Sequence, residues 1–198
     1  MGTIIWREEW KRPYESIWSV IENIKISNSI SGSDLIHYLN DNKTDKTRSV
    51  RNVNKLSEEA LDKLKELTNI DFLAIKNTML KLSKLERNNP LHYFHTHLCY
   101  CEKCIHHNYH SYLHQYKLID VCPFHVTKLQ TKCKDCKKDI YHYNIAQAIP
   151  FTCKCGYQLY QTIDEPTWRN LSTFEPVLNI SIKHDNYTLS ENLQECYQ

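Results

Sequence analysis

Residues 101–155 contain four closely spaced pairs of possible metal ligands: Cys101-Glu-Lys-Cys104, Cys122-Pro-Phe-His125, Cys133-Lys-Asp-Cys136 and Cys153-Lys-Cys155. Seventeen residues separate the first two pairs, seven separate the second pair from the third, and sixteen separate the last two. Two residues between two cysteines allow a tight turn that brings both sulfurs to one ion, and a gap of about 15–20 residues lets a second turn supply the other half. The spacing therefore predicts two zinc sites.

The simplest assignment joins neighbouring pairs. One site would then hold Cys101, Cys104, Cys122 and His125, and the other Cys133, Cys136, Cys153 and Cys155. A cross-braced assignment, first pair with third and second with fourth, stays open, and Cys99 could replace Cys101 because it lies two residues away. Either way each zinc ion receives four protein ligands, which is typical of structural zinc, since catalytic zinc keeps one position for water.

Composition limits the classes of protein that this chain can represent. Its 198 residues are 41% hydrophobic and 24% charged, enough for one compact domain or two small ones and unlike a disordered chain. No apolar run approaches the length of a membrane span, and the first ten residues do not resemble a signal peptide. We therefore expect a cytoplasmic protein in which cysteines, nine in all, serve as metal ligands more than as disulfide partners. Only three glycines argue against a glycine-rich phosphate loop.

The chain divides by composition into three parts. Residues 1–90 are predicted to be mainly helical, 91–160 to form a double zinc-binding module with short strands or turns, and 161–198 to be an acidic tail with an extended segment near 177–182. The predicted fold is thus an α-helical region followed by two small zinc-finger or zinc-ribbon motifs. The first helix should begin near Pro13–Glu15 and carry an apolar stripe, and Ser33 should cap a short second helix.

Residues 57–87 are similar to a helix-turn-helix. Ser57 is a good N-cap, Asn69 tolerates the left-handed backbone that ends a helix, and a second amphipathic helix should run from Asp71 to Arg87. Two groups of polar residues could contact DNA phosphates, although a solvated surface is the alternative for both. They are Lys76, Asn77, Lys81, Lys84 and Arg87 on that helix, and Lys43, Lys46, Arg48 and Arg51 in the polar loop before it.

Charge argues against strong nucleic-acid binding. The whole chain has a formal net charge of +2, and residues 161–198 contain two basic against six acidic residues. Residues 91–160 contain eight basic and four acidic residues, but zinc on thiolates adds a negative charge at each site and brings this segment close to neutral. We therefore expect DNA contacts to be weak and independent of sequence.

Seven histidines surround the first two ligand pairs, and they raise the question of catalysis. His106-His107-Asn108 invites comparison with histidine-metal nucleases, but the spacing differs and no acidic residue stands beside the pair to orient a general base. The simpler expectation is that these histidines pack in the interior, form hydrogen bonds and stay neutral.

Together the motifs resemble the TniQ/TnsD family of transposition target-selection proteins. The similarity is carried by the first Cys-x2-Cys pair, His114-Gln115, Val-Cys-Pro-Phe-His at 121–125, the second Cys-x2-Cys pair and the closing Cys153-Lys-Cys-Gly156. Pro13-Tyr-Glu-Ser-Ile-Trp-Ser19 resembles the family's opening helix, and 64–70 its helix-turn-helix, with Asn69 in place of glycine. Val126 also stands where the family has glycine.

The resemblance implies a short, non-catalytic adaptor with two structural zinc ions. Such a protein joins a target-recognition complex to an AAA+ transposition ATPase in the bacterial cytoplasm, at the nucleoid when on DNA. The first helix and the zinc module would offer surfaces to the protein partner. The alternatives are a stand-alone zinc-dependent nucleic-acid-binding regulator and, less favoured, the histidine-metal nuclease.

Overall fold

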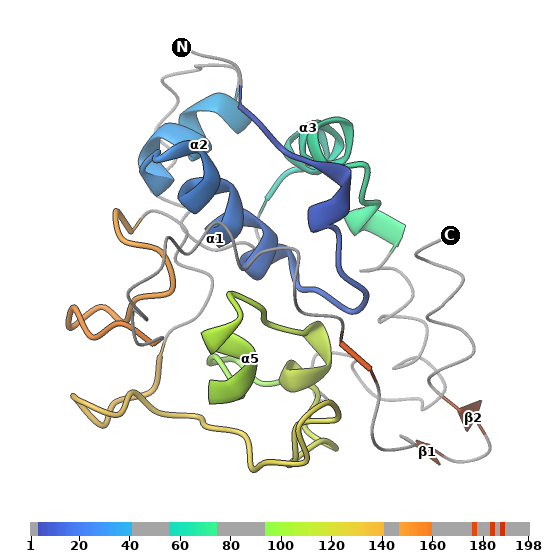
Figure 1. Cartoon of the computed structure of the whole chain (residues 1–198), viewed down its shortest axis with the longest axis vertical. Coiled ribbons are helices and arrows are strands. Elements are labelled where there is room, and N and C mark those ends of the chain that lie inside the picture. The colour runs from blue at the N-terminus through green and yellow to red at the C-terminus, as the bar shows by residue number, and fades with distance from the viewer. Residues whose placement is uncertain are drawn as a thin grey trace.

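The computed structural model describes residues 4–40, 56–74, 94–140, 147–159 and 176–177, together with the backbone of 183–184 and 187–188. Its regular elements are mostly short helices (Figure 1). They are η1 (Glu8–Trp10), α1 (Ile17–Asn28), α2 (Gly32–Leu39), α3 (Glu58–Thr68), α5 (Glu102–His106), η4 (Tyr112–Gln115), β1 (Lys183–His184) and β2 (Tyr187–Thr188). The described part of the chain is therefore mainly helical, as predicted.

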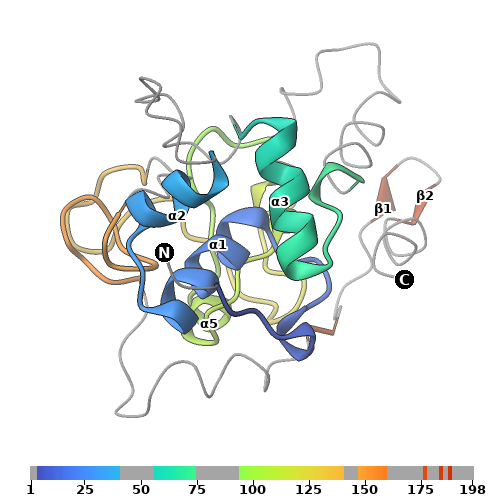
Figure 2. The same ribbon diagram turned by 90° about the horizontal axis from the view of Figure 1, so that it is seen from above.

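Helix α1 is the central element of the fold. Figures 1 and 2 show α1 between α2 and α3, and in Figure 1 helix α5 lies below α1, on the side away from those two helices. Eight successive residues, Trp18–Lys25, are buried, so the helix is enclosed on all its faces. The expectation that this helix offers a surface to a partner stays a prediction, and within the described residues only its half-buried ends, Ile17 and Ile26–Asn28, could supply one.

Two helices begin at different residues from those predicted. Ser16 caps α1 by accepting a hydrogen bond from the backbone N–H of Ser19, because Tyr14 has a left-handed backbone (φ 60°) that no helix can include. Ser31, rather than Ser33, caps α2, and it forms a capping box with Asp34. Ser31 and Ser33 are both of a residue type that caps helices. The reciprocal hydrogen bonds between Ser31 and Asp34 explain why α2 is capped by Ser31.

The predicted limits of α3 are confirmed. Ser57 accepts a hydrogen bond from the backbone N–H of Ala60, and Asn69 ends the helix with φ 55°. The chain is helical again at 72–74, and the rest of the predicted helix 71–87 lies outside the described residues. A helix-turn-helix is therefore not confirmed here.

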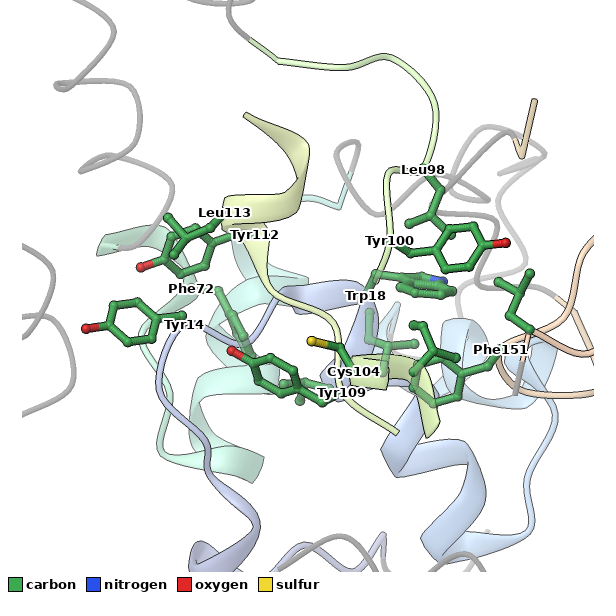
Figure 3. Close-up of a cluster of buried hydrophobic side chains, with 14 of the residues drawn as sticks. Tyr14, Trp18, Phe72, Leu98, Tyr100, Cys104, Tyr109, Tyr112, Leu113 and Phe151 are labelled. Atoms are coloured by element: carbon green, nitrogen blue, oxygen red, sulfur yellow. The ribbon is translucent and has the colours of Figure 1, made fainter. Parts of the chain in front are cut away.

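A single apolar core contains residues from both sides of the predicted boundary at residue 90. Figure 3 shows Trp18 of α1 and Phe72 gathered with side chains of the cysteine-rich segment, among them Tyr100, Tyr109 and Phe151. The Trp18 ring meets the rings of His110 and Phe151 edge-on, with centroids 5.2 and 5.1 Å away. The boundary itself lies outside the described residues.

Little of the predicted acidic tail is described. β1 and β2 pair antiparallel, with Lys183 opposite Thr188 and His184 opposite Tyr187. The expected extended segment at 177–182 lies, apart from residue 177, outside the described residues. Among the helices in the described ranges, none has the length and apolar character needed to cross a membrane.

Candidate metal centres

Three of the four ligand pairs sit in hairpin turns of one design. An isolated antiparallel bridge closes each turn, and the backbone N–H of the first ligand donates across it over 2.8–3.0 Å. The bridges are Val121 with Lys128, Lys132 with Asp139, and Thr152 with Gln158. The corresponding donors are Cys122, Cys133 and Cys153. Each hairpin thus fixes its two ligand side chains on the inside of a tight turn.

The residue that follows the second ligand completes each turn with a positive φ. The values are 52° at Val126, 59° at Lys137 and 93° at Gly156. Each of these residues also donates its N–H to the carbonyl of the first ligand of its pair, over 2.9, 3.1 and 2.9 Å respectively. Glycine adopts this backbone freely, whereas valine and lysine do so at a cost. This geometry explains why glycine suits the position that Val126 occupies.

The first pair is held differently, by helix α5. Cys101 is the N-cap of this helix and Cys104 lies three residues on, so that one helical turn brings their sulfurs to the same side. The backbone N–H of Ile105 donates to the carbonyl of Cys101 over 3.0 Å and closes that turn.

The first tetrad consists of Cys101, Cys104, Cys122 and His125, whose ligand atoms gather around one point. The sulfurs of Cys104 and Cys122 are 3.6 Å apart, and Nδ1 of His125 lies 3.6, 3.2 and 3.7 Å from the sulfurs of Cys101, Cys104 and Cys122. A zinc tetrahedron with Zn–S bonds of about 2.3 Å has S···S edges of about 3.8 Å and slightly shorter S···N edges. The tetrad therefore fits a tetrahedral ion bound through Nδ1.

The second tetrad consists of Cys133, Cys136, Cys153 and Cys155. The sulfurs of Cys133 and Cys155 are 3.7 Å apart and those of Cys136 and Cys153 are 3.9 Å apart, which again matches the edges of a zinc tetrahedron. The two tetrads join neighbouring pairs, so the sequential assignment describes the geometry and the cross-braced one does not. Cys101 rather than Cys99 belongs to the first tetrad.

The two tetrads differ in burial. Cys101, Cys104 and Cys122 are fully buried within the shared core, and His125 is half-buried. In the second tetrad Cys155 is exposed and Cys136 is half-buried. Metal at the first site is thus shielded by the core, whereas metal at the second is within reach of solvent.

Crowding of the sulfurs alters their acidity when no cation is present. Burial raises the pKa of the Cys104 thiol, while hydrogen bonding from Cys104 lowers the pKa of Cys101. One thiolate can be accommodated in this way, but several adjacent thiolates need a cation. The donor set, three thiolates with an imidazole or four thiolates, is the set that zinc prefers.

His114 supports the first tetrad without belonging to it. Its Nε2 lies 3.8 Å from the sulfur of Cys104 and 3.5 Å from that of Cys122, and its Nδ1 is buried with no hydrogen-bond partner among the described residues. We assign the ring proton to Nε2, where it can donate to ligand sulfurs. Burial lowers the pKa of His114 well below its usual value, so the ring is neutral.

A buried polar network ties α1 to the chain that follows the first ligand pair. Arg12 donates to the carbonyls of His107 and Asn108, each over 2.8 Å, and Asn23 donates to that of Asn108 over 2.9 Å. Glu15 accepts hydrogen bonds from Arg12, Ser19 and Asn23. Arg12 and Asn23 therefore hold the segment that carries the first tetrad, and Glu15 of the Pro13–Ser19 motif holds both of these side chains in place.

Two more contacts join α1 to the tetrads. Ser16 donates its backbone N–H to the carbonyl of His110 over 2.8 Å, and Glu22 accepts a hydrogen bond from the backbone N–H of Phe151, two residues before Cys153. The Glu22 carboxylate is itself paired with the buried Lys25 ammonium at 2.9 Å. Through these bonds one helix positions the chain beside both metal centres.

The residues predicted to contact DNA lie outside the described residues, so their arrangement stays a prediction. They are Lys43, Lys46, Arg48, Arg51, Lys76, Asn77, Lys81, Lys84 and Arg87.

The expectation that the histidines pack and stay neutral fits His110 and His114 but not His106, which is exposed. Burial lowers the pKa of His110 to about 4, and the ring is hydrogen-bonded to Ser16 Oγ and to the Cys99 carbonyl. Asn108, which the nuclease comparison invoked, is buried with a left-handed backbone (φ 51°), and its carbonyl accepts hydrogen bonds from Arg12 and Asn23. These bonds tie the backbone at residue 108 to Arg12 and to α1.

One further cluster was not anticipated: His95, His97 and Cys99 bring their ligand atoms within 4.8 Å of one another. The signal available in the sequence was the occurrence of three potential ligands at alternate positions, which a bend at 96–97 brings together. Compared with models of known protein families and with curated proteins, the chain matches none.

Proposed function

We propose that this protein is a non-catalytic, zinc-stabilised adaptor in the selection of target sites for DNA transposition. In this role it joins a target-recognition complex to an AAA+ ATPase, in the bacterial cytoplasm and at the nucleoid. The proposal rests on the order of the TniQ-like motifs along the chain. It is supported by the way those motifs, far apart in sequence, contact one another.

The observation that carries the proposal is the link between the Pro13–Ser19 motif and the first ligand segment. A motif shared with a family is informative when its residues have a physical task. Here Ser16 Oγ is hydrogen-bonded to the His110 ring, and Ser19 Oγ donates to the Asn108 carbonyl. Glu15 accepts hydrogen bonds from Ser19 and from Arg12, which itself donates to carbonyls of the 107–111 segment. In this chain, the motif residues that carry the resemblance are thus residues that join the helix to the first metal-binding segment. That coupling favours the family resemblance over a chance match of cysteine pairs.

A non-catalytic role is favoured by the composition of the tetrads. Each offers four protein ligands to one ion, which leaves no coordination position for a water nucleophile or a substrate. Zinc of this kind contributes folding energy and rigid loops rather than chemistry. We propose two structural zinc ions and DNA contacts that are weak and made to phosphates.

Affinity capture from the native host tests the proposal. The zinc-loaded full chain would be used as bait in a nuclease-treated lysate, with an untreated lysate in parallel, and bound proteins identified by mass spectrometry. Recovery of an AAA+ ATPase in both lysates is the expected result. Recovery of no ATPase in either lysate, or loss of every partner after nuclease treatment, would contradict it.

The second candidate is a stand-alone nucleic-acid-binding regulator, which the nine basic and polar residues predicted to contact phosphates would favour. It predicts tight duplex binding whose affinity falls steeply with salt, because each neutralised phosphate releases a counterion. The adaptor predicts weak binding with a shallow salt dependence.

A further inference from the structure

The segment before the first tetrad carries three potential ligands outside both tetrads. They are His95, His97 and Cys99, whose ligand atoms lie within 4.8 Å of one another. The two imidazole rings face each other with centroids 5.1 Å apart and planes inclined by 50°. The chain bends at 96–97, so that the rings and the thiol converge.

The backbone on both sides of this trio is fixed. The N–H of His95 donates to the Gln115 carbonyl over 2.9 Å, and the N–H of Leu98 donates to the Ile140 carbonyl over 2.9 Å. The carbonyl of Cys99 accepts two buried hydrogen bonds, from His110 Nε2 over 2.9 Å and from Gln115 Nε2 over 3.0 Å. The three side chains therefore start from defined positions, which lowers the entropic cost of binding an ion.

The three side chains make no other polar bond within the described residues. Neither imidazole nor the Cys99 sulfur has a hydrogen bond to another described side chain or backbone group, and Cys99 is buried without a disulfide. Both histidines are half-buried, so an ion can reach the trio from solvent. This combination of a buried sulfur and two accessible imidazoles differs from His110 and His114, whose rings are fully enclosed.

The charges around the trio are mixed and include two acids. The Asp139 carboxylate acts electrostatically on the Cys99 thiol and the Asp120 carboxylate acts on the His95 ring, while the Lys117 ammonium acts on His95 with the opposite sign. Zinc on one thiolate and two neutral imidazoles keeps a net charge of +1, which the nearby carboxylates favour.

We propose that His95, His97 and Cys99 form a third transition-metal site, of a different kind from the two tetrads. Two imidazoles and one thiolate suit a zinc-class divalent ion. Three protein ligands leave one position for water or for a donor from another molecule. The ion at this site is exchangeable, whereas the ions in the tetrads are enclosed by four ligands. This inference is independent of the adaptor role.

Cobalt provides a direct test. The full chain is loaded with two equivalents of zinc and titrated with Co²⁺, which binds such ligands more weakly than zinc and leaves zinc in the tetrads. The expected result is saturation by one further equivalent, with a thiolate-to-cobalt charge-transfer band from Cys99. A wild-type chain that shows no such band overturns the proposal.

Variants assign the band to its ligands. His95→Ala and His97→Ala should each weaken cobalt binding by more than the roughly 10–100-fold that loss of an outer partner of a metal ligand costs. His106→Ala removes an exposed histidine of the same chain region and should leave the titration unchanged. Cys99→Ala should abolish the charge-transfer band. Retention of two zinc ions and of helical ellipticity shows that each variant is folded. A band unaffected by both histidine substitutions refutes the assignment.

Discussion

Arg12 and Asn108 lie 96 residues apart in sequence and meet in the interior, where the guanidinium of Arg12 donates to the carbonyl of Asn108 over 2.8 Å. The same guanidinium pairs with the Glu15 carboxylate, and both side chains are almost wholly buried. A buried charge is tolerated only when it is paired and hydrogen-bonded. This pair, which precedes α1, is thus part of the buried network that ties the helix to the first metal-binding segment.

Arg12→Ala should destabilise the protein strongly, because it leaves the Glu15 carboxylate without its cation and the His107 carbonyl without the hydrogen bond that Arg12 donates. Breaking a buried pair in this way costs about 3–5 kcal/mol. Urea unfolding followed by circular dichroism measures the loss. Arg7→Ala is the matched control, since Arg7 forms an exposed pair with Glu9, and it should change stability by at most about 0.5 kcal/mol. Equal effects of the two substitutions would contradict the role given to Arg12.

Removal of metal should proceed in a fixed order. Cys155 is exposed and the first tetrad is enclosed by the core, so a chelator should take the second ion before the first. Native mass spectrometry during chelation should show a species with one ion that retains most of its helical ellipticity. Simultaneous release of both ions would argue that the two centres open together.

Substitution of a ligand should have a larger effect in the buried first tetrad than in the partly exposed second tetrad. Cys122→Ala removes a fully buried ligand and should unfold the cysteine-rich segment, because structural zinc binding supplies folding energy. Cys155→Ala removes an exposed ligand and should leave α1–α3 helical. Circular dichroism and zinc content of the two purified variants check this prediction, and a Cys122→Ala chain with native helicity and both ions would refute it.

Val126→Gly should stabilise the protein. Val126 is exposed and has φ 52°, a backbone that costs an L-residue about 1–2 kcal/mol, partly offset by the greater freedom of glycine in the unfolded chain. The expected gain is about 0.5–1 kcal/mol, read from thermal unfolding at constant zinc. Gly156→Ala is the converse: a methyl group there meets no atom within 4 Å, so the backbone alone should make it destabilising. A stabilised Gly156→Ala chain would show that these turns are not strained.

Acidification should destabilise the fold partly through His110. Burial lowers its pKa to about 4, whereas the unfolded chain takes up that proton near pH 6.5. The contribution is therefore complete above pH 6.5 and is lost as pH falls towards 4, by up to about 3 kcal/mol. The zinc ligands titrate too, so the measurement is the difference between wild type and His110→Gln. Parallel stability curves from pH 7 to pH 4 would contradict the assignment.

The metal centres could be predicted from sequence because ligand spacing is a local property. Two residues between ligands define a tight turn, and the structure places all eight predicted ligands in two tetrads. What spacing could not decide was whether pairs join sequentially, or whether Cys99 replaces Cys101, since both depend on how distant loops meet.

The burial of the polar face of α1, unlike that of its apolar stripe, could not be predicted because its polar residues find their partners far along the chain. Asn23 bonds to Asn108, 85 residues away, and Glu22 bonds to Phe151, 129 residues away. Read alone, these side chains indicate a solvent-facing surface. The trio His95, His97 and Cys99 could not be predicted for a related reason. Its convergence depends on a bend that backbone hydrogen bonds to residues 115 and 140 hold in place.

Zinc counting on the His97→Ala chain tests the central claim most directly, because this variant removes the third site and leaves the tetrads alone. Native mass spectrometry and elemental analysis should find two zinc ions per chain, and their complete removal should be accompanied by loss of helical ellipticity. Fewer than two ions, or a fully metal-free chain that keeps its native ellipticity, would contradict the account of two structural zinc centres organised around α1.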